Sequence, residues 1–127
     1  MICLPYGTID NGNSGWVAWA YLNHWLSVYN DIYCSSLTVG VHEIGHNLGL
    51  QHSGQGRLEY GDDSGYMGAP LYSDDVPLMC FNGAKSWQLG WYNDKNLDLV
   101  LTSSSSSSWT GRLVGVVDYN NTGTNEK

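Results

Sequence analysis

The apolar residues of the N-terminal third form two short runs with a polar break between them. Residues 16–22 (WVAWAYL) and 25–29 (WLSVY) are rich in β-branched and aromatic side chains, which favour strands. The pattern predicts two short strands, or one long bent strand, after a loop over the turn-forming residues 8–15. His24 falls at the break, where we expect a turn or surface residue rather than a catalytic one.

A helix is predicted over residues 37–48. Ser35 and Ser36 offer N-caps before this segment, and Gly49 is a suitable stop after it. Inside the segment, apolar side chains recur at helical spacing and define one apolar face, made of Val41, Ile44 and Leu48.

The segment after this helix is long and irregular. Residues 51–80 are rich in Gly, Asp, Ser, Tyr and Pro and show no periodic pattern. So long an irregular stretch is unusual inside a compact domain unless something such as a metal ties it down. Residues 82–89 predict a short helix that Gly90 ends, and we expect Trp87 and Trp91 to pack in the core.

The C-terminal part changes in composition. Residues 97–101 (LDLVL) alternate like a strand, whereas the six serines of residues 103–108 have the composition of a flexible linker. Residues 109–120 (WTGRLVGVVDYN) read as the beginning of a further strand region. We therefore predict one domain over residues 1–100, and a Ser-rich linker with the start of a further β region over residues 101–127.

Size and charge exclude several classes of function. The chain has 127 residues, which is the size of one small domain. Its 5 basic and 12 acidic residues give a net charge of −7, which argues against nucleic-acid binding and against docking on anionic membranes. No apolar run is long enough to insert in a membrane as a helix. Composition does not indicate an oligomeric state.

The three cysteines, Cys3, Cys34 and Cys80, have no C-x-x-C spacing, which argues against a thiolate zinc site. In an oxidising compartment one pair would form and one thiol would remain, and all three pairings stay open. The residues that follow Met1 lack the basic and apolar regions of a signal peptide. If the protein is secreted, its signal lies outside this chain.

Residues 42–52 (HEIGHNLGLQH) carry the pattern H-E-x-x-H-x-x-G-x-x-H. On a helix, His42 and His46 project from one face about 6 Å apart along the axis, where both can hold one Zn²⁺ ion. Gly49 can turn the chain sharply without a Cβ penalty, which returns His52 as a third ligand. Three neutral imidazoles leave a fourth position for water, as in catalytic zinc sites.

Glu43 follows the first of these histidines and is expected to act as the general base. It would take a proton from the zinc-bound water that attacks the scissile carbonyl, and pass it to the leaving amine. Chance produces the whole pattern in a chain of this composition with a probability on the order of 10⁻⁵. The alternative is a helix whose histidines are polar surface residues. Such a site suits zinc best, although copper or cobalt would also bind.

The extended motif resembles that of the metzincin clan of zinc endopeptidases. Those proteins place a methionine in a tight turn beneath the zinc ligands. Met67 resembles this methionine because Gly65 and Gly68 flank it with turn chemistry, and Met79 is the competing candidate. Ser53, next to the third histidine, is a candidate to support it by hydrogen bonding.

A wider resemblance is to the gametolysin (autolysin-type) metalloprotease family. Four segments carry it: WVAWAYLNHWLSVYN, VHEIGHNLGLQHSG, EYGDDSGYMG and MCFNGAKSWQLGWY. The resemblance implies an α+β fold, namely a truncated metzincin-like zincin domain. Short antiparallel strands would precede one zinc-binding helix, and an irregular lower subdomain with a short C-terminal helix would follow. It also implies one catalytic Zn²⁺ held by His42, His46 and His52, with Glu43 as the base.

The resemblance further implies a secreted or cell-surface endopeptidase. Its expected substrates are proteins, namely glycoproteins of the extracellular matrix or cell wall, and not nucleic acid. In the clan, an edge strand pairs with extended substrate by β-augmentation. Residues 16–21 resemble that strand, and the alternative is an ordinary buried strand. The expected substrate-binding residues are Trp16, Ala18, Trp19, Ala20 and Tyr21.

The chain also departs from the clan. Only about 35 residues precede the predicted zinc-binding helix, fewer than in a metzincin domain, so we expect a fragment of the catalytic domain. Two other functions therefore stay open. The chain could be a catalytically silent zinc-binding remnant with a structural or interaction role, or it could bind glycans through exposed aromatic side chains.

Overall fold

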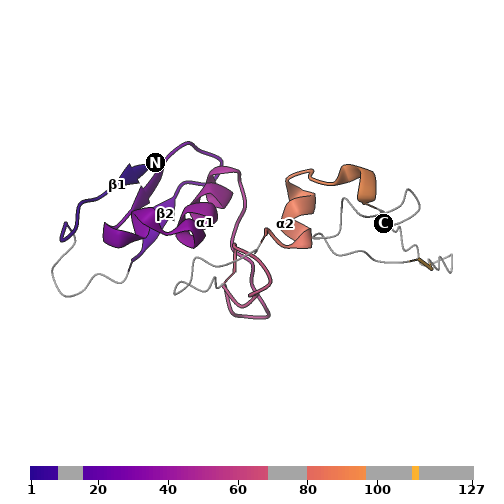
Figure 1. The fold of residues 1–127 in the computed structure, drawn as a ribbon. Helices are drawn as coiled ribbons and strands as arrows, with labels where there is room; N and C mark the ends of the chain where they lie inside the picture. Colours follow the sequence, from indigo (N-terminus) through magenta and orange to yellow (C-terminus); the bar gives the residue numbers. More distant parts are fainter. Residues whose placement is uncertain (9–15, 69–79, 97–109, 112–127) are drawn as a thin grey trace. The chain divides into compact units, whose positions relative to one another are not determined.

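The computed structural model describes residues 1–8, 16–68, 80–96 and 110–111 (Figure 1). The chain divides into two compact units, residues 1–85 and 86–127. The described strands are β1 (Ile2–Cys3), β2 (Ala18–Ala20) and β3 (Ser27–Tyr29), and the helices are η1 (Asp31–Ser35), α1 (Leu37–Asn47), α2 (Gly83–Gln88) and η2 (Asn93–Lys95). The α+β class is confirmed, with short strands before one longer helix. None of the described helices has the length and apolar character to cross a membrane.

A three-stranded sheet with the order β1-β3-β2 forms the base of the first unit. Strands β2 and β3 are antiparallel, with Trp19 opposite Val28, so the prediction of two short strands is confirmed. The turn between them contains Asn23 at φ 51° and the exposed His24. Strand β1 is parallel to β3, so the expectation of antiparallel strands alone is wrong. A two-residue strand carries no periodicity that a sequence pattern could reveal.

A disulfide joins the sheet to the segment before α1. Cys3 at the end of β1 is bonded to Cys34 in η1, with their Cα atoms 5.6 Å apart. Cys80 is free and exposed. The structure thereby selects one of the three pairings that the sequence left open, since only a distance in the fold distinguishes them.

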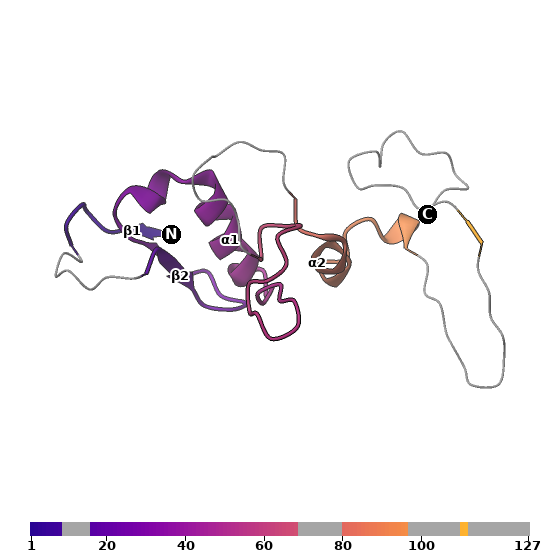
Figure 2. The same ribbon diagram turned by 90° about the horizontal axis from the view of Figure 1, so that it is seen from below.

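Helix α1 lies across the sheet (Figures 1 and 2). Ser36 is its N-cap, and its hydroxyl accepts a hydrogen bond from the Val39 backbone N–H at 3.4 Å. The helix packs on β2 and β3 with an inward face that is mostly polar or small, made of Thr38, Val39, His42, Glu43, Gly45 and His46.

The predicted apolar face of α1 is not the buried one. Ile44 and Leu48 are each 49% exposed, and Val41 is only partly buried. Buried hydrophobic side chains from other elements instead surround the polar face of the helix: Val28, Tyr29, Leu50, Tyr66, Met67 and Phe81. The helix therefore buries its polar face, with close packing at Gly45, rather than its most apolar stripe.

Helix α2 begins as predicted, because the Asn82 side-chain oxygen accepts a hydrogen bond from the Lys85 N–H at 2.9 Å. It ends at Gln88, before Gly90 at φ 74°. The expectation that Trp87 and Trp91 pack in the core is wrong, since they are 60% and 44% exposed. A helix of six residues has too little surface to bury large side chains on every side.

Several predictions lie outside the described residues. They are the strand over residues 97–101, the serine run over residues 103–108, the competing Met79, and nearly all of residues 109–120. The division into domains at residue 100 likewise stays a prediction.

Candidate metal centre

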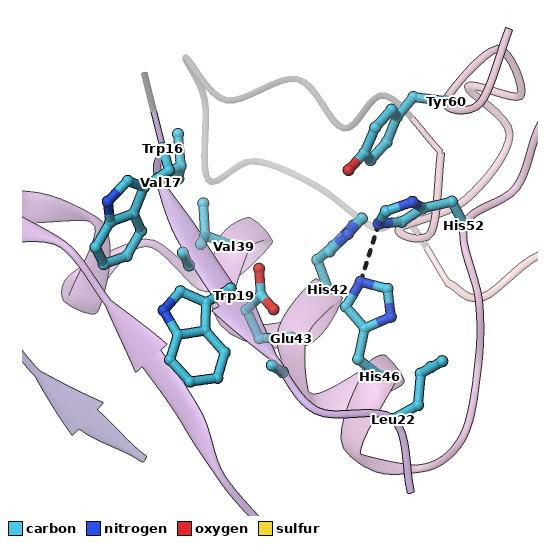
Figure 3. Close-up of a pocket in the computed structure, with 12 residues that line it drawn as sticks. Trp16, Val17, Trp19, Leu22, Val39, His42, Glu43, His46, His52 and Tyr60 are labelled. Carbon is cyan, nitrogen blue, oxygen red and sulfur yellow. Dashed lines mark hydrogen bonds between the residues drawn. The ribbon is translucent and has the colours of Figure 1, made fainter. Parts of the chain in front are cut away.

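Three histidines converge beside the sheet. His42 and His46 project from α1, and His52 returns from the segment after it, so that one nitrogen of each ring lies within 4.8 Å of the others. The Nε2 atoms of His46 and His52 are 3.0 Å apart (Figure 3). Within the residues that the structure describes, this is the group of side chains able to hold a metal ion.

The reversal that returns His52 is built at the end of α1. Gly49 has φ 90°, and its N–H donates to the His46 carbonyl at 2.8 Å, while the Leu50 N–H donates to the Gly45 carbonyl at 2.9 Å. These two bonds form a Schellman motif, in which glycine takes the left-handed position. Leu50 is fully buried and fixes the direction of the chain. The predicted role of Gly49 as a helix stop and turn is confirmed.

Each histidine has a hydrogen-bond partner at Nδ1, on the side away from the cluster. His42 Nδ1 lies 2.6 Å from the Tyr66 carbonyl oxygen, and His46 Nδ1 lies 2.8 Å from the Leu50 carbonyl oxygen. His52 Nδ1 lies 2.7 Å from Glu59 Oε1. A carbonyl or carboxylate oxygen can only accept, so each Nδ1 carries the proton and each Nε2 of a neutral ring presents a lone pair.

The protonation of the rings fits a metal ion. Burial lowers the pKa of His42 to about 4, and burial also lowers the pKa of His46, so both rings are neutral at pH 7. Two Nε2 lone pairs that face each other at 3.0 Å repel unless a cation or a shared proton lies between them. Imidazole nitrogens with a free lone pair are donors that zinc accepts.

Glu43 extends from the same helix into the pocket beside the cluster (Figure 3). It is 5% exposed, and within the described structure its Oε2 atom is buried without a hydrogen-bond partner. Burial raises the pKa of this carboxyl to about 7. A carboxyl with this pKa can accept a proton and return it near neutral pH.

Met67 packs against α1 at Gly45, next to His46. It is 1% exposed and lies in a turn closed by the Gly68 N–H, which donates to the Gly65 carbonyl at 3.1 Å. Its Sδ atom fills the space in which a side chain on Gly45 would lie, between the two helical histidines. The preceding residue of the turn, Tyr66, supplies the carbonyl that holds His42. One turn thus contacts both the backbone of α1 at Gly45 and the ring of His42.

Ser53 does not support His52 directly. Its backbone N–H donates to the Met67 carbonyl at 2.6 Å, and its hydroxyl accepts from the Asn82 amide at 3.3 Å. Asn82 also donates to Asp62 at 2.7 Å. Ser53 therefore ties the third-ligand segment to the methionine turn, and the hydrogen bond that we expected from Ser53 to His52 is made by Glu59 instead.

A pocket of about 500 Å³ lies between the cluster and β2. Of the residues predicted to contact substrate, Trp16, Ala18, Trp19 and Ala20 line it; Tyr21 is not among the lining residues and is 56% exposed. The lining also includes residues without a predicted role: Val17, Leu22, Val39 and Tyr60 (Figure 3).

The edge of β2 that faces away from β3 is open among the described residues. The Val17 carbonyl accepts a hydrogen bond from Asn30 N–H at 3.0 Å, so Val17 faces β3. Alternate residues of a strand face the same neighbour. The backbone N–H and C=O groups of Ala18 and Ala20 are therefore directed to the open edge, beside the pocket.

Two residues of the centre were not predicted from the sequence. Glu59 contacts His52, and the ring of Tyr60 packs on the His52 ring with centroids 4.0 Å apart. Both lie in the irregular segment, where no periodicity marks a functional position. The signal that could have found them is an acidic residue seven positions after the last ligand, followed by an aromatic ring.

A family model and a known protein both match the chain. The family model described as gametolysin peptidase M11 matches residues 4–115. Autolysin of Chlamydomonas reinhardtii is 35% identical to the chain over 102 residues, which cover 68% of this chain and 16% of autolysin. The chain thus spans much less than two thirds of that relative's length. No solved structure matches the chain.

The contact between Gly45 and Met67 predicts opposite effects of alanine at two glycines of α1. Gly40→Ala enters open space and should stabilise the protein by up to about 1 kcal/mol through helix propensity. In Gly45→Ala, the new Cβ would overlap Met67 and lie 3.0 Å from Phe81, so a net loss of about 1–2 kcal/mol is expected. Denaturant unfolding of both variants measures this, and a stabilised Gly45→Ala protein would contradict the packing described.

The raised pKa of Glu43 predicts how the stability of metal-free protein depends on pH. Between the ordinary pKa of 4.5 and the folded pKa of about 7, the folded protein keeps a proton that the unfolded chain has released. The unfolded chain, which releases this proton, is therefore favoured increasingly as the pH rises through this window, and the fold loses stability. Glu43→Gln should match wild-type stability near pH 4 and exceed it by roughly 3 kcal/mol above pH 7.

Denaturant unfolding in the presence of a chelator, repeated at several pH values, measures this difference. The contribution of His42 is common to both proteins and cancels. A difference between the two proteins that does not change with pH would show that Glu43 is not desolvated in the fold.

Proposed function

The chain belongs to the gametolysin peptidase M11 family, and from this membership and the convergence of three histidines we propose that it is a zinc-dependent metalloendopeptidase. The observation that carries the proposal is the arrangement of the rings. Each Nδ1 is engaged by an acceptor, and the nitrogens on the opposite side lie within 4.8 Å of one another.

His42, His46 and His52 are the proposed zinc ligands. A zinc ion held by these residues would supply a Lewis acid, which would polarise the scissile carbonyl and lower the pKa of the attacking water. The backbone carbonyls of Tyr66 and Leu50 hold two of the rings in the tautomer that binds metal through Nε2. Because the Nε2 atoms of the histidines would bind the metal, proton transfer requires another residue.

Glu43 is the proposed general base. Its carboxyl is buried in the pocket wall with one oxygen unpaired within the described structure, so it can accept a proton from the attacking water. With a pKa of about 7, it can then return that proton to the amine that leaves. This reversal of roles is efficient when the pKa lies near the working pH.

Substrate is proposed to bind along the open edge of β2. An extended peptide added there would pair with the outward N–H and C=O groups of Ala18 and Ala20, and its scissile bond would lie in the pocket next to Glu43. Main-chain pairing of this kind selects extended protein segments and places few demands on their side chains. Trp16 and Trp19 line the same pocket and would contact substrate side chains.

The proposed architecture, methionine turn, substrate class and location rest on the family. We place the domain in the metzincin architecture, with Met67 as the methionine of the turn beneath the ligands. The proposed substrates are glycoproteins of the extracellular matrix or cell wall, in keeping with the name of the relative, autolysin. The protein would accordingly act outside the cell.

Glu43→Gln provides the sharpest test of the catalytic assignment. The variant should retain one zinc per chain and lose about 10²–10⁴-fold in kcat, because only the proton acceptor is removed. His52→Ala should bind zinc much more weakly, because one of the three proposed ligands is removed. Elemental analysis and cleavage of an unfolded protein substrate measure both. A wild-type chain that holds zinc yet cleaves no peptide bond would support the silent remnant and overturn the proposal.

A proline in β2 tests the substrate-binding edge. Ala18→Pro removes an N–H that is directed away from β3, and edge strands tolerate proline at such positions. Loss of one main-chain hydrogen bond to substrate should lower kcat/KM by about tenfold, with zinc content unchanged. Ala18→Ser keeps the N–H and is the matched control. Equal kcat/KM for Ala18→Pro and the control would exclude pairing at this edge.

A further inference from the structure

The partner of His52 differs in kind from those of the other two histidines. His42 and His46 are held by backbone carbonyls, whose positions the methionine turn and the Schellman motif determine. His52 is held by a side chain, Glu59, at 2.7 Å. We propose that Glu59 is a positioning residue that holds the third ligand ready for the metal; this inference rests on the proposed metal binding.

His52 needs such a partner more than the other ligands do. Its side chain is 21% exposed, whereas the two helical histidines are buried. Packing therefore restrains the His52 ring less, and its segment belongs to no helix or strand. Without an acceptor at Nδ1, a neutral imidazole also populates the tautomer with the proton on Nε2, which cannot bind a metal through that atom.

The carboxylate of Glu59 selects the productive tautomer. Because the Glu59 Oε1 atom acts as the acceptor in this contact, the His52 proton stays on Nδ1. The lone pair of Nε2 is then directed to the side on which His46 Nε2 lies, 3.0 Å away. The ring of Tyr60 packs against the imidazole, with centroids 4.0 Å apart, and limits its rotation.

A compact turn carries Glu59 to this position. The N–H and C=O groups of Gln55 and Leu58 pair at 3.0 and 3.1 Å, and the Gly61 N–H donates to the Leu58 carbonyl at 3.1 Å. A Cβ on Gly54 would lie 2.9 Å from the Leu58 carbonyl oxygen, and one on Gly61 would lie 2.9 Å from two side chains. The turn is thus closed tightly by glycines at both ends, which fixes the backbone that presents Glu59.

The effect of Glu59 is one of geometry rather than of charge. Its side chain is 71% exposed, so the solvent screens the carboxylate charge and the contact with His52 adds little stability. An acceptor that orients a ligand ring still changes metal affinity, and loss of such partners typically costs 10–100-fold. Since Glu59 is exposed, we expect the lower end of this range.

Zinc affinity of the full chain, measured by competition with a chromophoric chelator, tests the role. Glu59→Ala should bind zinc about tenfold more weakly than wild type. Glu59→Gln, whose amide oxygen can still accept from Nδ1, should recover most of this affinity. Asp63→Asn is the matched control, because it removes a carboxylate from the same loop, four positions along, and should leave the affinity unchanged.

A second readout separates positioning from a merely structural role. Nitrogen-15 spectra of the histidines in metal-free protein report the tautomer of each ring. His52 should carry its proton on Nδ1 in wild type and in Glu59→Gln, and should become a mixture of tautomers in Glu59→Ala. A loop support alone would change the unfolding free energy and leave the tautomer as it is.

The outcomes distinguish this inference from the proposed function. If wild-type protein binds no zinc, the proposed function fails and the inference fails with it. If wild type binds zinc and Glu59→Ala binds it equally well, with an unchanged His52 tautomer, only the positioning role is overturned. A Glu59→Gln protein as weak as Glu59→Ala would also overturn it, since the argument requires an acceptor and not a charge.

Discussion

The hydrogen bonds of the three histidine Nδ1–H groups determine the geometry of the candidate metal centre. Each Nδ1 proton is given to an oxygen outside the cluster, and the three Nε2 lone pairs thereby face one region. The acceptors come from different local structures: a methionine turn, a helix terminus and a glycine-closed loop. Because every one of them must be in place before the lone pairs converge, the fold around the cluster serves to position oxygens as much as nitrogens.

This arrangement works against the stability of the metal-free protein. Helix α1 buries His42, Glu43 and His46, while Ile44 and Leu48 remain half exposed. Burial raises the pKa of Glu43 and lowers the pKa of His42, so both groups favour their neutral forms. Such shifts are expected for groups that are desolvated without a counter-charge. A divalent cation would supply that charge, so metal binding and folding free energy are expected to be coupled.

Local sequence predicted the features that depend on neighbours along the chain. The spacing of His42 and His46, the N-cap at Ser36 and the reversal at Gly49 all follow from short-range geometry, and the structure contains each of them. The features that depend on contacts across the fold were not predictable in this way. Glu59 becomes a partner of His52 only because Gly54 and Gly61 close the loop, and the Cys3–Cys34 pair is selected only by distance. The prediction of which face of α1 is buried was wrong for the same reason. Met67 packs on Gly45, and the apolar side chains of Ile44 and Leu48 stay half exposed.

The most direct test of the account is the coordination of zinc in the full chain, read by X-ray absorption spectroscopy. The account predicts one zinc with three imidazole nitrogens at about 2.0–2.1 Å and one oxygen ligand. It also predicts that His52→Ala reduces the imidazole count to two. A wild-type site with two imidazoles, or a spectrum that His52→Ala leaves unchanged, would contradict the convergence on which every other conclusion depends.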